Sequence, residues 1–293
     1  MKLGICLAGG GVKGAAHIGA IKALEENNIK FQYISGTSSG SIVAALYASG
    51  YTTDEIYNIF KKYCKKIKYI DIKNIFKCVF GIIFTGKIII DGLNSGKQIE
   101  KLINKVCIKK NIENIQDIKM PLIIPSVDMH NGKLYCFTSK MDRKSFSDEI
   151  EYINDINIGK AVRASCSYPV VFSPCDYKDT KLLDGGIREN VPWKETKDIG
   201  ADKVLSSVFE NDVDERCCKN FIDVADRSIQ LLCRELSNYE LDGVDYMVKF
   251  KSKKTSLLDM SKIDELYELG YNQTIKNIEN IKNLIKNNIS KTD

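Results

Sequence analysis

The sequence predicts an α/β protein with a mainly parallel central sheet. Strand and helix patterns alternate over the first 50 residues, which is the order that builds parallel strands joined by crossover helices. The first two predicted strands also run directly into glycine-rich turns, at 9–14 and at 36–40. Turns in this position gather at the carboxyl edge of a parallel sheet, where ligand and catalytic sites commonly lie.

Local patterns predict the first four elements in turn. Residues 3–8 are apolar, as in a buried strand, and residues 12–26 carry alanine, isoleucine and leucine at helical spacing. A second short strand follows at 31–35. A second helix follows at 41–49, and Gly50 closes it as glycine often does after a helix.

A third helix begins at Thr52, because Thr52 and Glu55 have the spacing of a capping box. The periodicity then blurs across 67–91, a basic segment rich in apolar and aromatic residues. Regular patterns resume beyond it, with helices expected near 98–107, 156–166 and 263–285 and strands at 122–128, 133–138 and 203–209. No internal repeat or glycine-, serine- or proline-rich linker interrupts the chain, so we expect one domain.

Composition limits the class of protein. The 293 residues include 44% hydrophobic residues, enough for a sizeable core, and carry a net charge of +5, which does not require a nucleic-acid partner. The ten cysteines show no zinc-binding spacing and suggest a reducing compartment. The apolar runs at 3–8 and 79–90 are too short or interrupted for a signal peptide or a membrane span, so a cytoplasmic location is expected.

The first glycine-rich turn contains Gly9, Gly11 and Gly14 in the pattern G-x-G-x-x-G. Backbone N–H groups at such a turn, followed by a helix N-terminus, suit a cofactor pyrophosphate and a catalytic oxyanion equally well. A dinucleotide site also needs a carboxylate at the end of the second strand, and that strand ends in Y-I-S-G-T-S-S-G without one. A nucleotide-binding oxidoreductase is therefore a weaker hypothesis than an oxyanion site. A plain tight turn is the third interpretation of these glycines.

The second turn, G-T-S-S-G at 36–40, fits the G-x-S-x-G elbow that exposes a serine nucleophile, here Ser38. A serine hydroxyl needs a base, yet the only histidines are His17 and His130, and no histidine follows the acids downstream of His130, as the order Ser, Asp or Glu, His of an α/β-hydrolase would require. Asp184, in L-L-D-G-G-I at the end of a short apolar strand, is the best candidate for a carboxylate base. With an ordinary pKa near 4 it would be a weak base, so we expect modest turnover.

Together these residues resemble the patatin-like phospholipase family, whose pattern is G-G-G-x-[KR]-G, G-x-S-x-G and D-G-[AG]. The motifs stand here at 9–14, 36–40 and 184–186, in the same order. The similarity also covers H-I-G-A at 17–20, R-A-S-C-S-Y-P-V-V-F-S-P at 163–174 and E-N-V-P-W at 189–193. It extends from residue 1 to about 210.

The resemblance implies a three-layer α/β/α fold and a lipid acyl hydrolase of the phospholipase A or lysophospholipase type. Ser38 would be the nucleophile and Asp184 the base. The oxyanion hole would be formed by Gly9, Gly10, Gly11 and Gly14, with backbone N–H donors at Gly10 and Gly11 and help from Ser39. The supporting motif positions would be Lys13, where the family more often has arginine, and Gly36, Gly40, Gly185 and Gly186. No cofactor and no metal are implied.

The expected organisation is a catalytic domain at 1–210 and a helical extension at 211–293 packed on the same domain. Within the first part, 61–95 interleaves lysines with isoleucine, tyrosine and phenylalanine, so it is either an ordinary helical cover or a lid that contacts anionic lipid. The expected partner is a phospholipid or lysophospholipid at a membrane surface, with peripheral membrane association and no nucleic acid. A catalytically silent lipid-binding protein remains an alternative.

Overall fold

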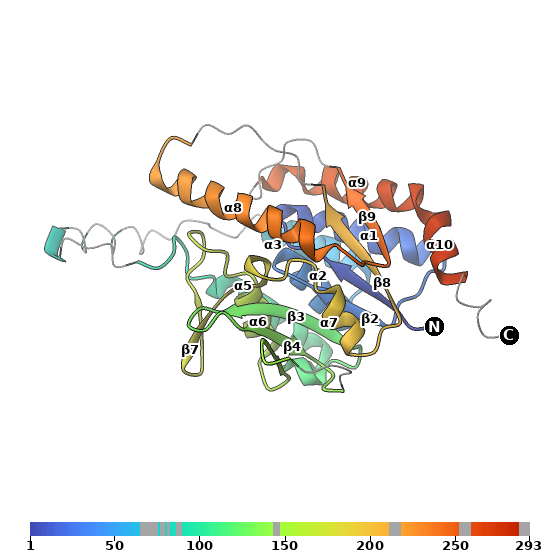
Figure 1. The fold of residues 1–293 in the computed structure, drawn as a ribbon, viewed down its shortest axis with the longest axis horizontal. Helices are drawn as coiled ribbons and strands as arrows, with labels where there is room; N and C mark the ends of the chain where they lie inside the picture. Colours follow the sequence, from blue (N-terminus) through green and yellow to red (C-terminus); the bar gives the residue numbers. More distant parts are fainter. Residues whose placement is uncertain are drawn as a thin grey trace.

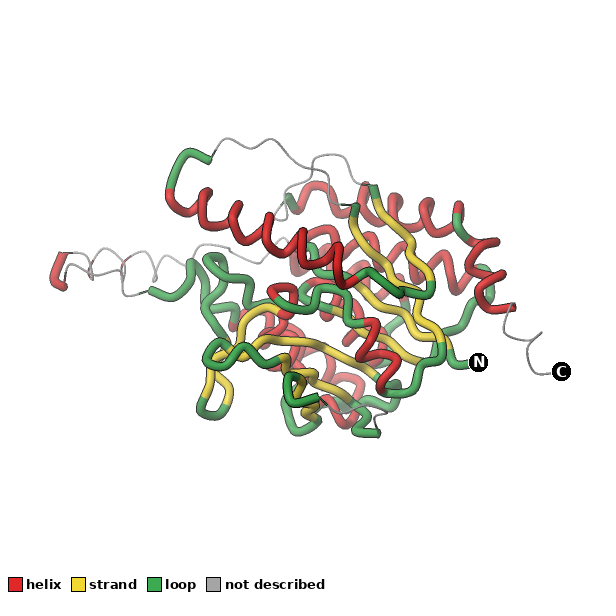
Figure 2. The backbone as a smooth tube through the Cα atoms, in the orientation of Figure 1, coloured by secondary structure: helices red, strands yellow, loops and turns green. Residues whose placement is uncertain are grey.

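A computed structural model describes residues 1–64, 76, 80, 83–85, 90–142, 147–210, 218–251 and 259–286. Most of the expected lid at 61–95 lies outside these residues, so its role stays a prediction. Strands occupy the centre of the molecule and helices lie on both sides (Figures 1 and 2). The expected α/β fold with a mainly parallel sheet is confirmed.

The sheet runs in the order β5-β4-β3-β2-β1-β8-β9, and the hairpin β6–β7 joins it beside β3. In the stretch β3-β2-β1-β8-β9 each strand is parallel to its neighbour, whereas β4 and β7 both run antiparallel to β3. The strands are β1 (Leu3–Leu7), β2 (Tyr33–Gly36), β3 (Leu122–Asp128), β4 (Leu134–Thr138), β5 (Ile150–Ile153), β6 (Cys175–Tyr177), β7 (Thr180–Asp184), β8 (Lys203–Phe209) and β9 (Tyr246–Phe250).

The helices lie close to the expected positions. Two features were not expected: the short helix α7, and a break that divides the last helix into α9 and α10. They are α1 (Gly14–Glu26), α2 (Ser39–Ala48), α3 (Thr53–Cys64), α5 (Lys97–Cys107), α6 (Ile158–Ser165), α7 (Trp193–Asp198), α8 (Phe221–Glu240), α9 (Ile263–Lys276) and α10 (Ile278–Lys286). Short 3-10 helices are η1 (Gly11–Lys13), η2 (Ile108–Lys110), η3 (Ile115–Asp117), η4 (Gly185–Ile187) and η5 (Met260–Lys262). The predicted capping box is present: Thr52 N–H donates to Glu55 Oε2 (2.8 Å), and Glu55 N–H donates to Thr52 Oγ1 (3.2 Å).

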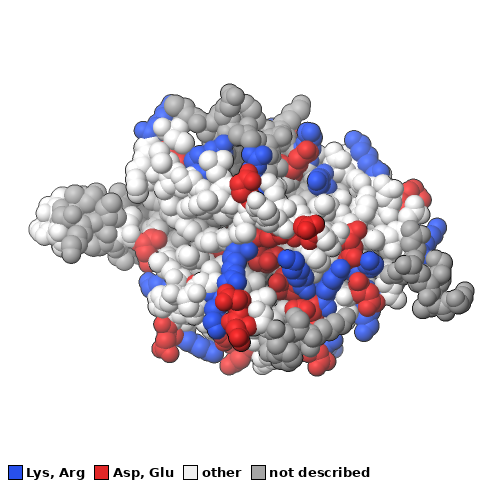
Figure 3. All heavy atoms as spheres, viewed as in Figure 1, with Lys and Arg blue, Asp and Glu red and all other residues white. Residues whose placement is uncertain are grey.

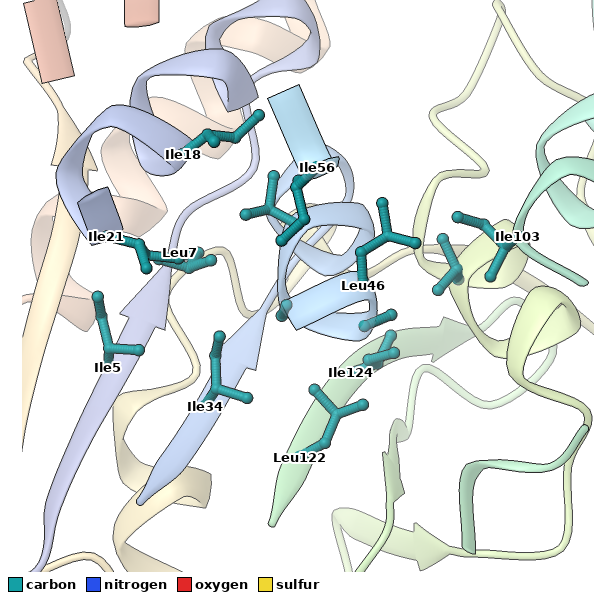
Figure 4. Close-up of a cluster of buried hydrophobic side chains, with 14 of the residues drawn as sticks. Ile5, Leu7, Ile18, Ile21, Ile34, Leu46, Ile56, Ile103, Leu122 and Ile124 are labelled. Carbon is teal, nitrogen blue, oxygen red and sulfur yellow. The ribbon is translucent and has the colours of Figure 1, made fainter. Parts of the chain in front are cut away.

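Alternation along β1 divides the core between the two faces of the sheet. Leu3, Ile5 and Leu7 pack into the larger cluster, whereas Cys6 and Ala8 pack into the smaller one on the other face. Figure 4 shows the larger cluster, in which side chains from β1, β2 and β3 meet side chains from α1, α2, α3 and α5. Residues of α7 and its flanks fill the smaller cluster, so helices cover both faces.

The region after residue 210 is not purely helical, which corrects that part of the expectation. Strand β9 pairs in parallel with β8, from Leu205 opposite Tyr246 to Phe209 opposite Phe250, so this region extends the central sheet. The last helix also divides at Asn277, whose backbone N–H caps α9 by donating to Thr274 O (3.0 Å). The division into 1–210 and 211–293 remains a prediction about which part carries the chemistry.

Surface charge is mixed on the face drawn in Figure 3, where basic and acidic side chains are interspersed. No helix in the described parts of the chain combines the length and the apolar character needed to cross a bilayer.

Candidate active site

Parallel register brings the two glycine-rich turns together at one edge of the sheet. Leu7, the last residue of β1, lies opposite Gly36 on β2 and opposite Ser207 on β8. Two turns therefore begin at the same level of the sheet: the glycine loop (residues 9–14), which follows β1, and the serine elbow (residues 36–40), which follows β2. Glycine is required at both elbow flanks because a Cβ on Gly36 would lie 2.4 Å from Gly40 O, and a Cβ on Gly40 would lie 2.3 Å from Leu7 O.

Ser38 occupies the tip of this elbow in a strained conformation. Its φ of 51° and ψ of −120° lie outside the regions that L-residues normally adopt, and such outliers persist where surrounding contacts enforce them. The contacts are Ser38 N–H donating to Ser165 Oγ (3.0 Å) and Ser38 O accepting from Ser41 Oγ (2.6 Å). The side chain is half-buried at the start of α2, where the helix dipole favours negative charge.

Asp184 reaches the site by an unexpected route. It ends β7, which runs antiparallel to β3 and places Asp184 opposite Ser126. Its backbone N–H donates to Ser167 O (3.0 Å), just after α6. The same short stretch, 165–167, thus holds the backbone of both Ser38 and Asp184, although these two residues are far apart in the sequence.

The Asp184 carboxyl is buried, with 2% of the residue exposed, and desolvation raises its pKa to about 7. Hydrogen bonding to the Ser38 side chain and to Gly186 N–H (2.8 Å, on Oδ1) opposes this rise. Oδ2 has no hydrogen-bond partner within 3.5 Å among the described residues. With this pKa, Asp184 is a stronger base than a carboxyl group of ordinary pKa.

The glycine loop packs directly against the serine elbow. A Cβ on Gly9 would lie 3.1 Å from Ser38 Cβ, and a Cβ on Gly14 would lie 3.0 Å from Ser39 Cβ. Gly11 has a φ of 59°, which glycine adopts without strain. The N–H of Gly9 already donates to Asn190 Oδ1 (2.9 Å), so this part of the loop is held by protein groups.

The remaining predicted positions support these loops. Lys13 Nζ lies 5.7 Å from the centre of the Phe209 ring, and a Cβ on Gly10 would lie 2.9 Å from the same ring. Gly185 approaches the β3 backbone, since a Cβ there would lie 2.5 Å from Pro125 O. Ser39 is buried beside Gly14, and its hydroxyl has no hydrogen-bond partner in the described residues.

Sequence reasoning assigned no role to three residues that the structure places around the site. They are Ser165, which accepts from Ser38 N–H, Asn190, which accepts from Gly9 N–H, and His17, whose ring contacts the carbonyl of Ala8. All three lie in stretches of the family resemblance, at 17–20, 163–174 and 189–193, which was the only sequence signal for them. His130 is exposed in a turn. No group of three or more histidine, cysteine or acidic residues in the described ranges is arranged to hold a metal.

Comparison with known proteins relates the chain to a family and to several relatives. A family model described as "Patatin-like phospholipase" matches residues 5–197. The Bacillus subtilis protein described as "Uncharacterized protein YqhO" is 33% identical over 197 residues, covering 65% of this chain and 66% of that protein. "Lysophospholipase NTE1" of Meyerozyma guilliermondii is 26% identical over 296 residues, covering 92% of this chain.

The chain spans 19% of the length of that lysophospholipase. Among solved structures, human GIVD cytosolic phospholipase A2 in complex with methyl gamma-linolenyl fluorophosphonate has a TM-score of 0.52. The match covers 98% of this chain and 59% of that chain at 10% identity, so the likeness concerns the fold.

Proposed function

The chain belongs to the patatin-like phospholipase family, and from this premise we propose that it hydrolyses fatty-acyl esters of lipids through a Ser38–Asp184 dyad. The observation that carries the proposal is that the stretch 165–167 holds the backbone of both residues. It places the strained Ser38 and the buried Asp184, whose pKa is raised to about 7, at one site. A base with a pKa near the working pH takes up and returns a proton efficiently. The lysophospholipase relative supports an ester of a phospholipid or lysophospholipid as the substrate.

In the first half of the reaction, Ser38 Oγ attacks the acyl carbonyl carbon while its proton passes to Asp184. The carbonyl oxygen becomes an oxyanion, which the N–H groups of Gly10 and Gly11 stabilise with help from Ser39. Each such donor typically contributes about 2.7–4 kcal/mol to transition-state stabilisation. The C–O bond to the alcohol then breaks, and the departing alkoxide takes the proton from Asp184.

In the second half, Asp184 accepts a proton from water as the water oxygen attacks the acyl-Ser38 ester. The same N–H groups stabilise the second oxyanion. When the ester bond breaks, Ser38 Oγ regains the proton and the fatty acid leaves. Every proton in this scheme moves between Ser38, Asp184, water and the leaving alcohol, so neither histidine is needed.

Helix α8 supports the proposal that the protein meets its substrate at a membrane surface. Its carboxyl end is anchored beside the site, since Glu240 O accepts from Trp193 Nε1 (2.7 Å) and Glu240 Oε2 accepts from Asn190 N–H (3.0 Å). Its outward side exposes several large apolar residues, together with Ser228, Glu235 and Asn238. The apolar ones are Phe221, Val224, Leu231, Leu232 and Tyr239. Uncharged side chains predominate over α8 in Figure 3. Apolar side chains next to a lipid-hydrolysing site suit insertion into a bilayer interface.

The proposal is tested by labelling with a fluorophosphonate, mapping the adduct by mass spectrometry and measuring fatty-acid release from phospholipid and lysophospholipid vesicles. We expect labelling at Ser38, and loss of release in both Ser38→Ala and Asp184→Asn. His130→Ala is the control and should keep full activity. A folded wild-type protein that binds vesicles without labelling or release would instead be a silent lipid-binding protein.

A further inference from the structure

One peptide unit at the start of the glycine loop is held from both ends. The carbonyl of Ala8 accepts a hydrogen bond from His17 Nε2 (2.8 Å). The N–H of Gly9, which belongs to the same peptide, donates to Asn190 Oδ1 (2.9 Å). A peptide unit is planar, so fixing both of its polar groups fixes the orientation of the plane.

The environment of His17 determines which of its nitrogens carries the proton. A carbonyl oxygen only accepts, so Nε2 must be protonated, and Nδ1 then accepts from the Ser207 hydroxyl (2.8 Å). The ring is fully buried and lies 4.9 Å from the ring of Phe209, and burial lowers the pKa of His17 to about 4. His17 is therefore a neutral donor at physiological pH and cannot serve as a base while Nδ1 is paired.

Asn190 is held just as firmly on the other side. Its backbone N–H donates to Glu240 Oε2 (3.0 Å), and its side-chain Nδ2 faces Ser237 Oγ (3.5 Å), both on α8. Its Oδ1 therefore points away from α8 and toward the loop. A Cβ on Gly9 would lie 2.7 Å from this oxygen, so the loop and the side chain are in close contact.

We propose that His17 and Asn190 are positioning residues that orient the Ala8–Gly9 peptide so that the N–H groups of Gly10 and Gly11 face the oxyanion. The inference rests on the proposed function. The glycines at 9, 10 and 11 lack side chains that could hold the loop, so its conformation must be imposed by neighbouring groups. Oxyanion donors act only when they are held in the productive geometry, and misplacement by about 1 Å can cost about 100-fold in rate.

The test uses Asn190→Ala, which removes the acceptor for Gly9, and Asn27→Ala as the matched control, which removes another asparagine side chain, bonded through Nδ2 to Ala23 O (2.9 Å) at the far end of α1. The readouts are kcat and KM on a water-soluble ester, and the Ki of a trifluoromethyl ketone, whose serine adduct carries an oxyanion. We expect Asn190→Ala to lower kcat roughly 10- to 100-fold, to weaken ketone binding by a similar factor and to leave KM nearly unchanged. Asn27→Ala should keep the wild-type kcat and Ki.

A second pair tests the other end of the peptide. His17→Gln keeps an N–H donor near the position of Nε2 and should retain most of the activity, whereas His17→Leu removes the donor and should lose kcat and ketone affinity together. If His17→Leu does not fold, the Asn190 and Asn27 variants decide the matter alone.

The two proposals fail in distinguishable ways. A wild-type enzyme labelled at Ser38, with Asn190→Ala equal to wild type in kcat and Ki, overturns the positioning role alone. A loss of kcat without weaker ketone binding also overturns it, because a misplaced oxyanion hole must affect both. A wild-type protein that is not labelled at Ser38 overturns the proposed function and this inference with it.

Discussion

The backbone N–H of Ser38 donates a hydrogen bond of 3.0 Å to the hydroxyl of Ser165, a residue 127 positions away in the sequence. This bond links the serine elbow to the end of α6. Two residues further on, Ser167 O accepts a hydrogen bond from Asp184 N–H. We expect Ser165→Ala to lower kcat on a soluble ester about tenfold, because the elbow loses the contact that orients it. The loss of one buried hydrogen bond should also cost roughly 1 kcal/mol of unfolding free energy.

Ser49→Ala separates these two effects. It removes another buried serine hydroxyl, bonded to Ala45 O (2.7 Å), at the far end of α2. It should lose stability with an unchanged kcat. Equal kcat losses in the Ser165 and Ser49 variants would contradict a specific link between Ser165 and the elbow.

The pH dependence of activity should follow Asp184. As a base, the carboxyl must be ionised, and burial raises its pKa to about 7, so kcat/KM should rise with pH through about 7 and level off above it. The rate is measured on a soluble ester from pH 5 to 9, in the wild type and in His130→Ala, which should retain the same rising limb. A flat profile over this range would indicate a base of ordinary carboxyl pKa.

Asp184 should also make the folded state less stable as pH rises. A carboxyl whose folded pKa lies above its unfolded value of 3.8 binds more protons in the folded state between those two values, so stability falls as pH increases from about 4 to about 7. At about 1.4 kcal/mol per pKa unit, the rise to about 7 disfavours the ionised form by roughly 4 kcal/mol.

Asp184→Asn removes that charge and keeps an oxygen for Gly186 N–H. We expect this inactive variant to melt several degrees above wild type at pH 8 and close to wild type at pH 4. Thermal unfolding at both values measures the difference. A lower melting temperature at pH 8 would show that contacts of the ionised carboxylate outweigh its desolvation.

Membrane contact through α8 predicts a separation between activity on vesicles and activity in solution. Leu232 is 72% exposed on the outward side of α8, and Leu232→Asp should lower the vesicle-bound fraction and fatty-acid release while leaving hydrolysis of a soluble ester unchanged. Ile108→Asp, an equivalent change at an exposed position of η2, serves as the control and should bind vesicles like wild type. Equal binding by both variants would exclude α8 as the contact.

Local patterns were sufficient for most of the fold. The fully buried strand β1 and the helix after it were predictable because a continuous apolar run and a helical repeat each have a local signal. Strand β9 was missed, although Tyr246, Val248 and Phe250 alternate with Met247 and Lys249. Its partner β8 lies about 40 positions earlier, and pairing over such a distance leaves little trace in a single short segment.

The same distinction between local and long-range information applies to the site. The sequence by itself determined the chemical groups, because the glycine loop, the serine elbow and the Asp-Gly-Gly turn each depend on backbone conformations that only particular residues allow. Only the tertiary structure decided how these groups act on one another. The antiparallel path of Asp184, the links through Ser165 and Asn190, and the raised pKa of the carboxyl depend on burial and on contacts between distant segments, which no local pattern encodes.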